Sequence, residues 1–345
     1  MGGGQARMVA SAAGALVGRG HRVDVYSFGA VRPAPGLEAR RVTRGDFLSG
    51  RFFRWLRDGR YDVVHTHGYS SLAPAKALLA EITQRATRVL TPHFHEAGGY
   101  PLAVRRAYDL SLGSAVCRAA HQIQVDTQFE KEALTRLQRI PEGRFEVIPP
   151  SLGGPFVGSA PPARGPPAGE FRVLFVGRLE PYKGVDTLVS AVAGLNGKGG
   201  RPVRLTIAGA DPTGGAFAAP EGTAEFLGPV DDGRLLSLYD TCGALALPSK
   251  AEAFGIVLLE AMSRGLPVVA ARAGGIPHFV NDGENGLLVE YGDAAGLESA
   301  IDRLASDEAL WRRLSKAGRE TAGAYTPEVI AGRTEAAYRR AVAAT

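Results

Sequence analysis

The stretch from Ala244 to Ala270 limits what this chain can fold into more than any other part of the sequence. Its first four residues form an apolar run of the length expected for a buried strand. Residues 256–262 then predict a buried helix, with Gly265 and Pro267 as stop signals, and residues 268–270 begin a second strand. Strand, loop, helix and strand form a βαβ unit, in which ligands bind beyond the carboxyl ends of the strands.

Two carboxylates flank the start of this predicted helix. Glu252 lies in the loop before it, and Glu260 lies one to two turns further on. Phe254 and Gly255 lie where the helix begins, so their backbone N–H groups are free to donate to an anion or a sugar hydroxyl. Glu252 could accept hydrogen bonds from hydroxyls near this point, and Glu260 from a neighbouring diol such as a ribose. The spacing alone favours an ordinary helix-surface Glu260 and an ordinary loop Glu252, because charged residues are common on helices.

The sequence around these glutamates, SKAEAFGIVLLEAMSRGLPVVA, resembles the E-x7-E signature of retaining glycosyltransferases with the GT-B fold, in particular glycosyltransferase family 4. The resemblance implies an α/β fold with two Rossmann-like domains that face each other across a cleft. It also implies the transfer of a hexosyl group, with retention, from a nucleotide-diphosphate sugar such as a UDP- or GDP-sugar to an acceptor hydroxyl.

The order of predicted elements divides the chain into two domains. Both halves alternate strands and helices, which is typical of Rossmann-like α/β domains. We expect an N-terminal acceptor domain at residues 1–154, a linker rich in Pro, Gly and Ala at 155–169, and a C-terminal donor domain at 170–325. The resemblance implies that a last helix, at residues 326–345, packs back on the first domain.

The bulk properties agree with a two-domain protein and exclude several classes of function. A chain of 345 residues suits two domains of ordinary size. The net charge of +5 is small, and no basic run is interleaved with aromatic residues, so nucleic acid is not an expected partner. No segment is long enough to span a bilayer, and Cys117 and Cys242 form no CxxC pair. We expect a cytoplasmic protein whose weakly basic surface could favour peripheral contact with the inner face of the membrane.

The first residues resemble the glycine loop and first helix of the family. Three glycines lead into a predicted Ala-rich helix at residues 6–19, and His21–Tyr26 reads as a strand. Family members carry another strand before the glycine loop, whereas this sequence begins at the loop. We expect either a true start further upstream or a sheet that lacks its first, central strand. The resemblance implies that Gly3 and Gly4 bring backbone close to the donor.

Two predicted strands of the first domain end in histidines. The first carries His65, read as a packed strand residue, and ends at His67, which is placed to face the cleft. The second ends at His93 and His95 and resembles the family's T-x-H segment, whose His approaches the donor sugar. The resemblance assigns His93 a catalytic position and leaves His67 and His95 on the acceptor side. Two histidines so close could also mark a metal site, but no third ligand with metal spacing follows, so no metal is expected.

A glycine-rich turn follows the first predicted strand of the second domain. It carries Arg178 and Lys183 ahead of a helix that starts near Asp186. Arg can bind two oxygens in a fork, Lys supplies a point charge, and the helix N-terminus adds its dipole, so the turn suits a diphosphate. In isolation a solvated turn is equally compatible. The segment resembles the family motif G-R-L-x-x-x-K-G at every fixed position, which implies that both cations neutralise the diphosphate as the glycosidic bond breaks.

The resemblance also implies which residues make the remaining contacts to the donor. Glu252 and the start of the helix would hold the sugar hydroxyls, Glu260 the ribose, and the segment around Leu227 would lie against the nucleobase. The donor-binding residues implied are Gly3, Gly4, Gly209, Leu227, Phe254, Gly255, Ile256 and Glu260.

Two other functions stay open at this point. One is a nucleotide-sugar epimerase of the same fold, although both the Arg178/Lys183 and the Glu252/Glu260 pairs fit a transferase. The other is a non-catalytic sugar-nucleotide binding protein, an interpretation that draws on the missing strand. The acceptor could be a saccharide, a lipid-linked sugar or a small molecule, and no cofactor is expected besides the donor substrate. The sequence does not give the oligomeric state.

Overall fold

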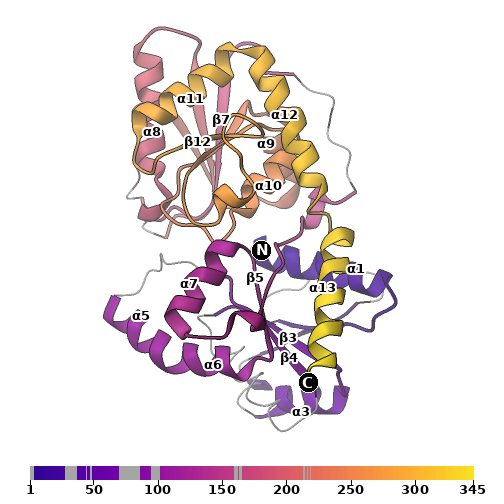
Figure 1. Cartoon of the computed structure of the whole chain (residues 1–345). Coiled ribbons are helices and arrows are strands. Elements are labelled where there is room, and N and C mark those ends of the chain that lie inside the picture. Colours follow the sequence, from indigo (N-terminus) through magenta and orange to yellow (C-terminus); the bar gives the residue numbers. More distant parts are fainter. Residues whose placement is uncertain are drawn as a thin grey trace. The chain divides into compact units, whose positions relative to one another are not determined.

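The structure is a computed structural model of the chain, which forms two compact units (Figure 1). Unit 1 comprises Met1–Gly153 together with Pro327–Thr345, and unit 2 comprises Gly154–Thr326. The described residues are 4–27, 37–43, 45–46, 49–69, 86–94, 102–158, 162, 165–212, 214–215, 217 and 219–345. No helix in these ranges is long and apolar enough to cross a membrane.

Unit 1 contains two parallel sheets in its described part. Strand β1 (Asp24–Ser27) pairs with β2 (Glu38–Arg41). The second sheet has the order β3-β4-β5-β6, with strands β3 (Val63–His67), β4 (Thr87–Thr91), β5 (Gln122–Val125) and β6 (Phe145–Val147). No pairing joins β1 to β3 among the described residues, so the two sheets remain separate.

The helices of unit 1 surround these sheets. In the described ranges they are α1 (Gly4–Gly18), α3 (Arg51–Gly59), α5 (Leu102–Tyr108), α6 (Ser114–Ala119), α7 (Gln128–Gln138) and α13 (Pro327–Ala343), with a π-helical turn at Asp109–Gly113 between α5 and α6. Helix α13 packs against α1, and Arg19 next to α1 donates from Nε to Glu335 Oε2 at 2.5 Å. On α13, Ile330, Ala331 and Ala337 are buried, so the last helix belongs to the core of unit 1.

Unit 2 is a six-stranded parallel sheet with helices around it. The strand order is β12-β11-β10-β7-β8-β9. The strands are β7 (Phe171–Val176), β8 (Val203–Ala208), β9 (Ala224–Gly228), β10 (Ala244–Leu247), β11 (Val268–Ala271) and β12 (Leu287–Val289). The helices are α8 (Val185–Gly197), α9 (Asp232–Thr241), α10 (Ile256–Ser263), α11 (Ala294–Ser306) and α12 (Glu308–Gly323).

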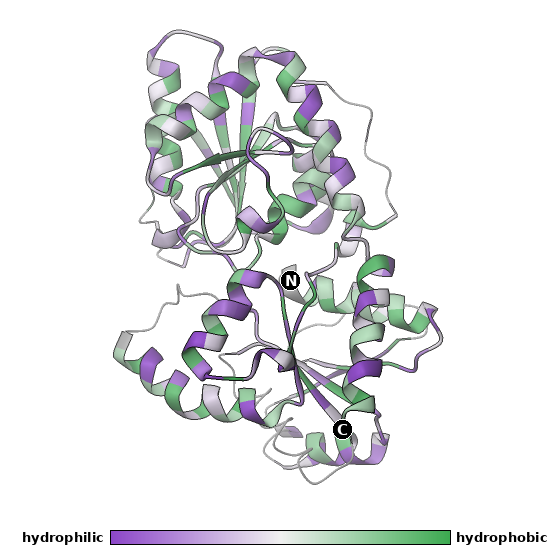
Figure 2. Ribbon diagram, viewed as in Figure 1, coloured by the Kyte–Doolittle hydropathy of each residue, from purple (hydrophilic) through white to green (hydrophobic). Residues whose placement is uncertain are grey.

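Strands β10 and β11 of unit 2 are apolar along their whole length, as expected for a parallel sheet covered on both faces. Every residue of β10 and β11 is buried. Figure 2 shows hydrophobic strands inside this unit and hydrophilic stretches along α11 and α12. Trp311 is fully buried, and its indole Nε1 donates to the carbonyl of Gly243 at 2.7 Å. The two Rossmann-like α/β folds predicted from the sequence are confirmed.

Removal of residues 327–345 should unfold unit 1 and leave unit 2 folded, because the buried face of α13 completes the first unit only. Fluorotryptophan labelling gives one ¹⁹F signal in each unit, since the chain has two tryptophans, Trp55 in unit 1 and Trp311 in unit 2. The Trp55 signal should move to its unfolded position at 25 °C while the Trp311 signal stays. A chain that lacks only Ala344 and Thr345 is the control, and an unshifted Trp55 signal in the longer truncation would contradict the assignment.

Candidate functional site

Arg178, Lys183 and Glu252, which are predicted to hold the donor, lie in segments that follow the carboxyl ends of strands in unit 2. The turn with Arg178 and Lys183 follows β7, the Glu252 loop follows β10, and the Gly274 loop follows β11. Because β7, β10 and β11 are parallel neighbours, their carboxyl ends meet at one edge of the sheet. Residues far apart in the sequence therefore come together there.

Lys183 and Glu252 form an ion pair at this edge. Lys183 Nζ lies 2.7 Å from Glu252 Oε1, and the two side chains are only 15% and 14% exposed. The turn is docked on the Glu252 loop, since the backbone N–H of Lys250 donates to the carbonyl of Tyr182 at 2.7 Å. Gly184 lies so close that an added Cβ would be 2.4 Å from the carbonyl oxygen of Pro248. The lysine is thus held beside the carboxylate by backbone contacts as well as by charge.

A second loop fixes the backbone of Glu252. The N–H of Gly275 donates to the Glu252 carbonyl at 2.9 Å. At Gly274, φ is +54°, and a Cβ there would lie 2.1 Å from the same carbonyl oxygen. The loops after β10 and β11 therefore contact each other through backbone. Because these contacts hold the backbone of Glu252, its side chain is the part of the loop that can change position.

Arg178 has a different partner from Lys183. Its Nη1 lies 2.8 Å from Glu180 Oε1, and the Arg178 side chain is 67% exposed. The structure therefore brings Lys183 to Glu252 and pairs Arg178 with a carboxylate that the sequence analysis did not single out. The acid two positions after Arg178 is the only sequence signal for this pair.

Glu260 is not an ordinary surface residue. It lies in α10 and is 2% exposed. The hydroxyl of Tyr239, on α9, donates to Glu260 Oε2 at 2.9 Å. A buried carboxylate needs such hydrogen bonds to offset the loss of hydration. Burial thus excludes the interpretation of Glu260 as an ordinary surface glutamate. Tyr239 is a partner that the sequence analysis missed.

The start of α10 is anchored by aromatic packing. Gly255 precedes the helix with φ of +93°, and Ile256 is the first helical residue. Phe254 is buried, and its ring stacks on that of Phe279 with centroids 4.3 Å apart. The Phe254 side chain therefore serves the core, so that any ligand contact at Phe254 would come from its backbone.

A cavity of about 200 Å³ lies at the carboxyl ends of β8 and β9. Its lining residues are Leu179, Ile207, Gly209, Asp211, Gly215, Phe217, Phe226 and Gly228. An added Cβ on Gly209 would lie 1.8 Å from the carbonyl oxygen of Gly177, so the loops after β7 and β8 touch through backbone. Of the predicted donor residues, Gly209 lines this cavity, whereas Leu227 lies between two of its lining residues.

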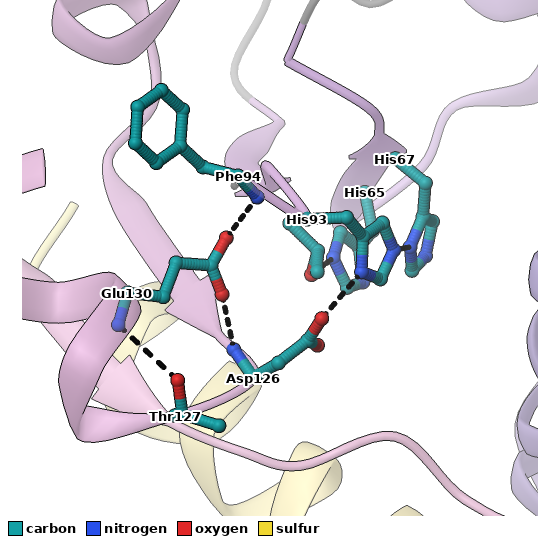
Figure 3. A network of polar contacts seen from close by, with 8 residues as sticks. His65, His67, His93, Phe94, Asp126, Thr127 and Glu130 are labelled. Atoms are coloured by element: carbon teal, nitrogen blue, oxygen red, sulfur yellow. Dashed lines mark hydrogen bonds and ion pairs between the residues drawn. The ribbon is translucent and has the colours of Figure 1, made fainter. Parts of the chain in front are cut away.

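Unit 1 holds a polar network of three histidines and two carboxylates (Figure 3). His65 and His67 lie on β3, and their rings stack with centroids 4.3 Å apart. His67 Nδ1 lies 3.2 Å from His93 Nε2, and His93 Nδ1 lies 2.8 Å from Asp126 Oδ2. His65 reaches the other way, with Nδ1 2.6 Å from the hydroxyl of Tyr338 on α13.

Glu130 holds the loop that carries His93. Its carboxylate accepts the backbone N–H of Phe94 at 2.5 Å and that of Asp126 at 2.6 Å. Thr127 caps α7, since its side chain accepts the N–H of Glu130. His93 has φ of +50°, a left-handed conformation that costs a non-glycine residue roughly 1–3 kcal/mol and that the surrounding contacts must enforce. The sequence pattern T-x-x-E, typical of a helix start, could have pointed to Glu130.

The charges in this network are distributed unevenly. Burial, together with the charge at His93, lowers the pKa of His65 to about 3, and burial lowers the pKa of His67 well below its ordinary value. Burial also acts to lower the pKa of His93, but Asp126 and Glu130 outweigh it and raise that pKa. Burial and the charge of Asp126 raise the pKa of Glu130. His93 is therefore the histidine of the three that carries a proton most readily.

Two of the predicted site residues lie outside the part of the chain that the structure describes. Gly3 and His95 lie outside the described residues, and Gly4 begins α1. Within the ranges that the structure describes, no three His, Cys, Asp or Glu side chains are arranged to share a metal ion. His67 and His93 are brought together directly, whereas the sequence analysis did not single out Asp126, Glu130 or Tyr338 as site residues.

Because the fold holds the buried histidines neutral, we expect unit 1 to lose stability in acid. In the unfolded chain His65 has its ordinary pKa of about 6.5, so below that pH the unfolded state binds a proton that the folded state refuses until about pH 3. Unit 1 should therefore lose stability as the pH falls from 6.5 to 5, and His65→Gln should reduce the slope by up to about 1.4 kcal/mol per pH unit.

Urea unfolding followed by the ¹⁹F signal of Trp55 measures this slope for unit 1 alone. His278→Gln, an exposed position in unit 2, is the matched control and should leave the Trp55 slope unchanged. An equal slope in His65→Gln and in the unmodified chain would show that His65 is not held neutral by the fold.

Comparison with known proteins identifies the family. The model of Glycosyltransferase Family 4 matches residues 2–152, and that of Glycosyl transferases group 1 matches residues 159–321. A D-inositol 3-phosphate glycosyltransferase of Mycobacterium marinum is 30% identical over an alignment that covers 95% of this chain and 79% of the relative.

Solved structures agree with this result. Sucrose-phosphate synthase from Thermosynechococcus elongatus superposes with a TM-score of 0.75 at 25% identity, covering 99% of this chain and 94% of the synthase. The Anabaena protein HepE, crystallised with UDP-glucose, gives a TM-score of 0.75 at 20% identity, with coverage of 99% and 97%. The chain therefore belongs to glycosyltransferase family 4, and its two Rossmann-like units have the GT-B fold.

Proposed function

We propose that this protein is a retaining hexosyltransferase that uses a nucleotide-diphosphate sugar, with a UDP-sugar as the first donor to test. The observation that carries the proposal is the Lys183–Glu252 pair at the carboxyl edge of the unit 2 sheet, next to the start of α10. A lysine at this place supplies positive charge to a diphosphate, and a carboxylate beside it accepts hydrogen bonds from sugar hydroxyls.

The ion pair would change partners when the donor binds. Without a ligand, Glu252 neutralises Lys183, and both charges are largely shielded from water. A diphosphate carries more negative charge than one carboxylate, so it would compete with Glu252 for Lys183. Arg178, paired with Glu180 on the same turn, would exchange in the same way. Glu252 would then be released towards the hydroxyls of the sugar. These cations and the helix N-terminus would stabilise the leaving diphosphate without a metal.

The nucleoside would occupy the rest of this edge. The cavity beyond β8 and β9, with Gly209 on its wall and the exposed ring of Phe226, is of a size and apolar character that suit a base. Glu260 would hold the ribose, oriented by the hydroxyl of Tyr239. The amides of Phe254, Gly255 and Ile256 at the start of α10 would contact the sugar or the phosphates.

Unit 1 would supply the acceptor side and one contact to the transferred sugar. We assign that contact to His93, whose protonation Asp126 and Glu130 support. His67 and His95 are assigned to the acceptor, and Gly3 and Gly4 to backbone contacts with the donor. The relative from Mycobacterium marinum is named for D-inositol 3-phosphate, which makes this phosphorylated cyclitol the first acceptor to test.

Lys183→Ala should weaken UDP binding by about 1 to 3 kcal/mol, since it removes a charge-assisted contact to the diphosphate. Isothermal titration calorimetry of the purified variants with UDP measures this loss. Lys198→Ala is the matched control. Lys198 also forms an ion pair with a glutamate of unit 2, Glu298, but it lies at the surface. Equal UDP affinity in Lys183→Ala and the unmodified chain would remove Lys183 from the donor site.

Glu252→Gln should have the opposite effect on binding. The variant removes the carboxylate that competes with the diphosphate for Lys183, so UDP affinity should be equal or higher. The rate of hexosyl transfer should fall by about 100-fold, because a neutral amide holds the sugar less well in the transition state. UDP release in the presence of UDP-glucose and inositol 3-phosphate measures the rate. Weaker UDP binding in this variant would contradict the exchange of partners.

A further inference from the structure

Both ring nitrogens of His93 are engaged within unit 1 (Figure 3). Nδ1 lies 2.8 Å from Asp126 Oδ2, and Nε2 lies 3.2 Å from Nδ1 of His67. The imidazole of His93 therefore has no ring nitrogen left for a ligand while these contacts hold. The sugar contact proposed for His93 would then come from its backbone, and the ring would act through His67.

The contact between the two rings ties the tautomer of His67 to the charge of His93. A hydrogen bond between two imidazole nitrogens needs a proton on one of them only. When His93 is neutral, its proton faces Asp126 from Nδ1, so Nε2 accepts and Nδ1 of His67 donates. When His93 is charged, its Nε2 also carries a proton and donates to Nδ1 of His67. A neutral His67 must then carry its own proton on Nε2.

Nε2 of His67 is the open end of this pair of rings. Among the residues that the structure describes, this nitrogen has no hydrogen-bond partner, and it is not sealed from solvent. His67 ends β3, and its side chain is only partly buried. Nε2 accepts a hydrogen bond while His93 is neutral and donates one once His93 is charged. A hydroxyl bound at Nε2 would therefore meet a group that can take its proton.

The surroundings favour a positive charge on His93 over one on His67. The ring of His65 stacks on that of His67, and burial lowers the pKa of His67 well below its ordinary value. Burial opposes charge at His93 too, but Asp126 and Glu130 outweigh it and raise the pKa of His93. A proton taken up by His67 is therefore passed on. The titratable groups that face the two rings are His65 on β3, Asp126 after β5, Glu130 on α7 and, through His65, Tyr338 on α13.

We propose that His67 is the general base for the acceptor hydroxyl and that His93 takes up the resulting positive charge. The hydroxyl proton moves to Nε2 of His67, and the proton on Nδ1 of His67 moves to Nε2 of His93. The acceptor oxygen keeps the electron pair of its O–H bond and forms the new bond to the sugar carbon. The diphosphate leaves with the electrons of the glycosidic bond, and Asp126 holds the imidazolium. This role of His67 rests on the proposed hexosyl transfer, for which it supplies the group that removes the acceptor's proton.

The exchange of tautomers can be observed without turnover. In protein labelled with ¹⁵N at histidine, the chemical shifts of the ring nitrogens distinguish protonated from unprotonated nitrogen. As the pH falls and His93 gains its proton, Nδ1 of His67 should lose a proton and Nε2 should gain one. Asp126→Asn should move this exchange to lower pH, because it removes the carboxylate that stabilises the charged ring. A single tautomer of His67 throughout the titration would overturn the proposal.

Two substitutions at His67 separate proton transfer from mere support of His93. His67→Asn places an amide near the position of Nδ1, so it can keep the contact with His93 but has no group in place of Nε2. His67→Gln reaches the position of Nε2, but an amide is not a base. Both variants should lower kcat for transfer from UDP-glucose to inositol 3-phosphate about 100-fold, with the KM for UDP-glucose unchanged. In the unmodified chain kcat should fall as the pH drops and His93 becomes charged, and neither variant should show this dependence.

His121→Asn is the matched control. His121 precedes β5, whereas Asp126 follows it, so this histidine lies at the opposite end of the sheet and its variant should keep the full rate. The ¹⁹F signal of Trp55 reports whether each variant is folded. Full activity in His67→Asn would show that His67 only supports His93 and would overturn its role as the base. Absence of transfer from any UDP-sugar by the unmodified chain would contradict the proposed function instead, and the ¹⁵N titration would still decide the proton exchange.

Discussion

Parallel strand pairing is the constraint on which both units depend. Because every pair of the described sheets is parallel, the loops that leave the strands in the same direction collect at one edge. In unit 2 this brings Lys183, after β7, to Glu252, after β10. In unit 1 it brings His93, after β4, to Asp126, after β5. Neither contact depends on residues that are close in sequence, and both are made by loops whose positions the strands dictate.

The Lys183–Glu252 pair of unit 2 and the histidine network of unit 1 stabilise buried charge in different ways. In unit 2 a cation and a carboxylate neutralise each other, so neither is left as an uncompensated buried charge. In unit 1 the stacked rings of His65 and His67 stay neutral, while His93 is stabilised in its charged form by Asp126. Glu130 contributes mainly by holding backbone, since its oxygens accept two N–H groups. Among the three histidines of the network, the positive charge is thus concentrated on the His93 imidazole.

The sequence predicts the strands well where they are short apolar runs bounded by turn residues. The bounds of β10 agree with the four-residue apolar run read from the sequence. The side-chain contacts of the site are harder to predict from the sequence. The burial of Glu260 depends on Tyr239, which lies on another helix, and the partner of Lys183 lies 69 positions away. Side-chain pairing across loops follows from the three-dimensional order of strands, which periodicity does not encode.

The discontinuity of unit 1 has a consequence for how the chain folds as it is made. Unit 2 is continuous from Gly154 to Thr326, so all of its residues leave the ribosome before the last helix does. Unit 1 starts first but receives α13, with its buried Ile330 and with Tyr338 at the histidine network, only after all of unit 2 has been made. Domains commonly complete their folding in the order of translation. Here unit 1 begins first but cannot be completed before unit 2, so the surface that α13 covers stays exposed until α13 has been made.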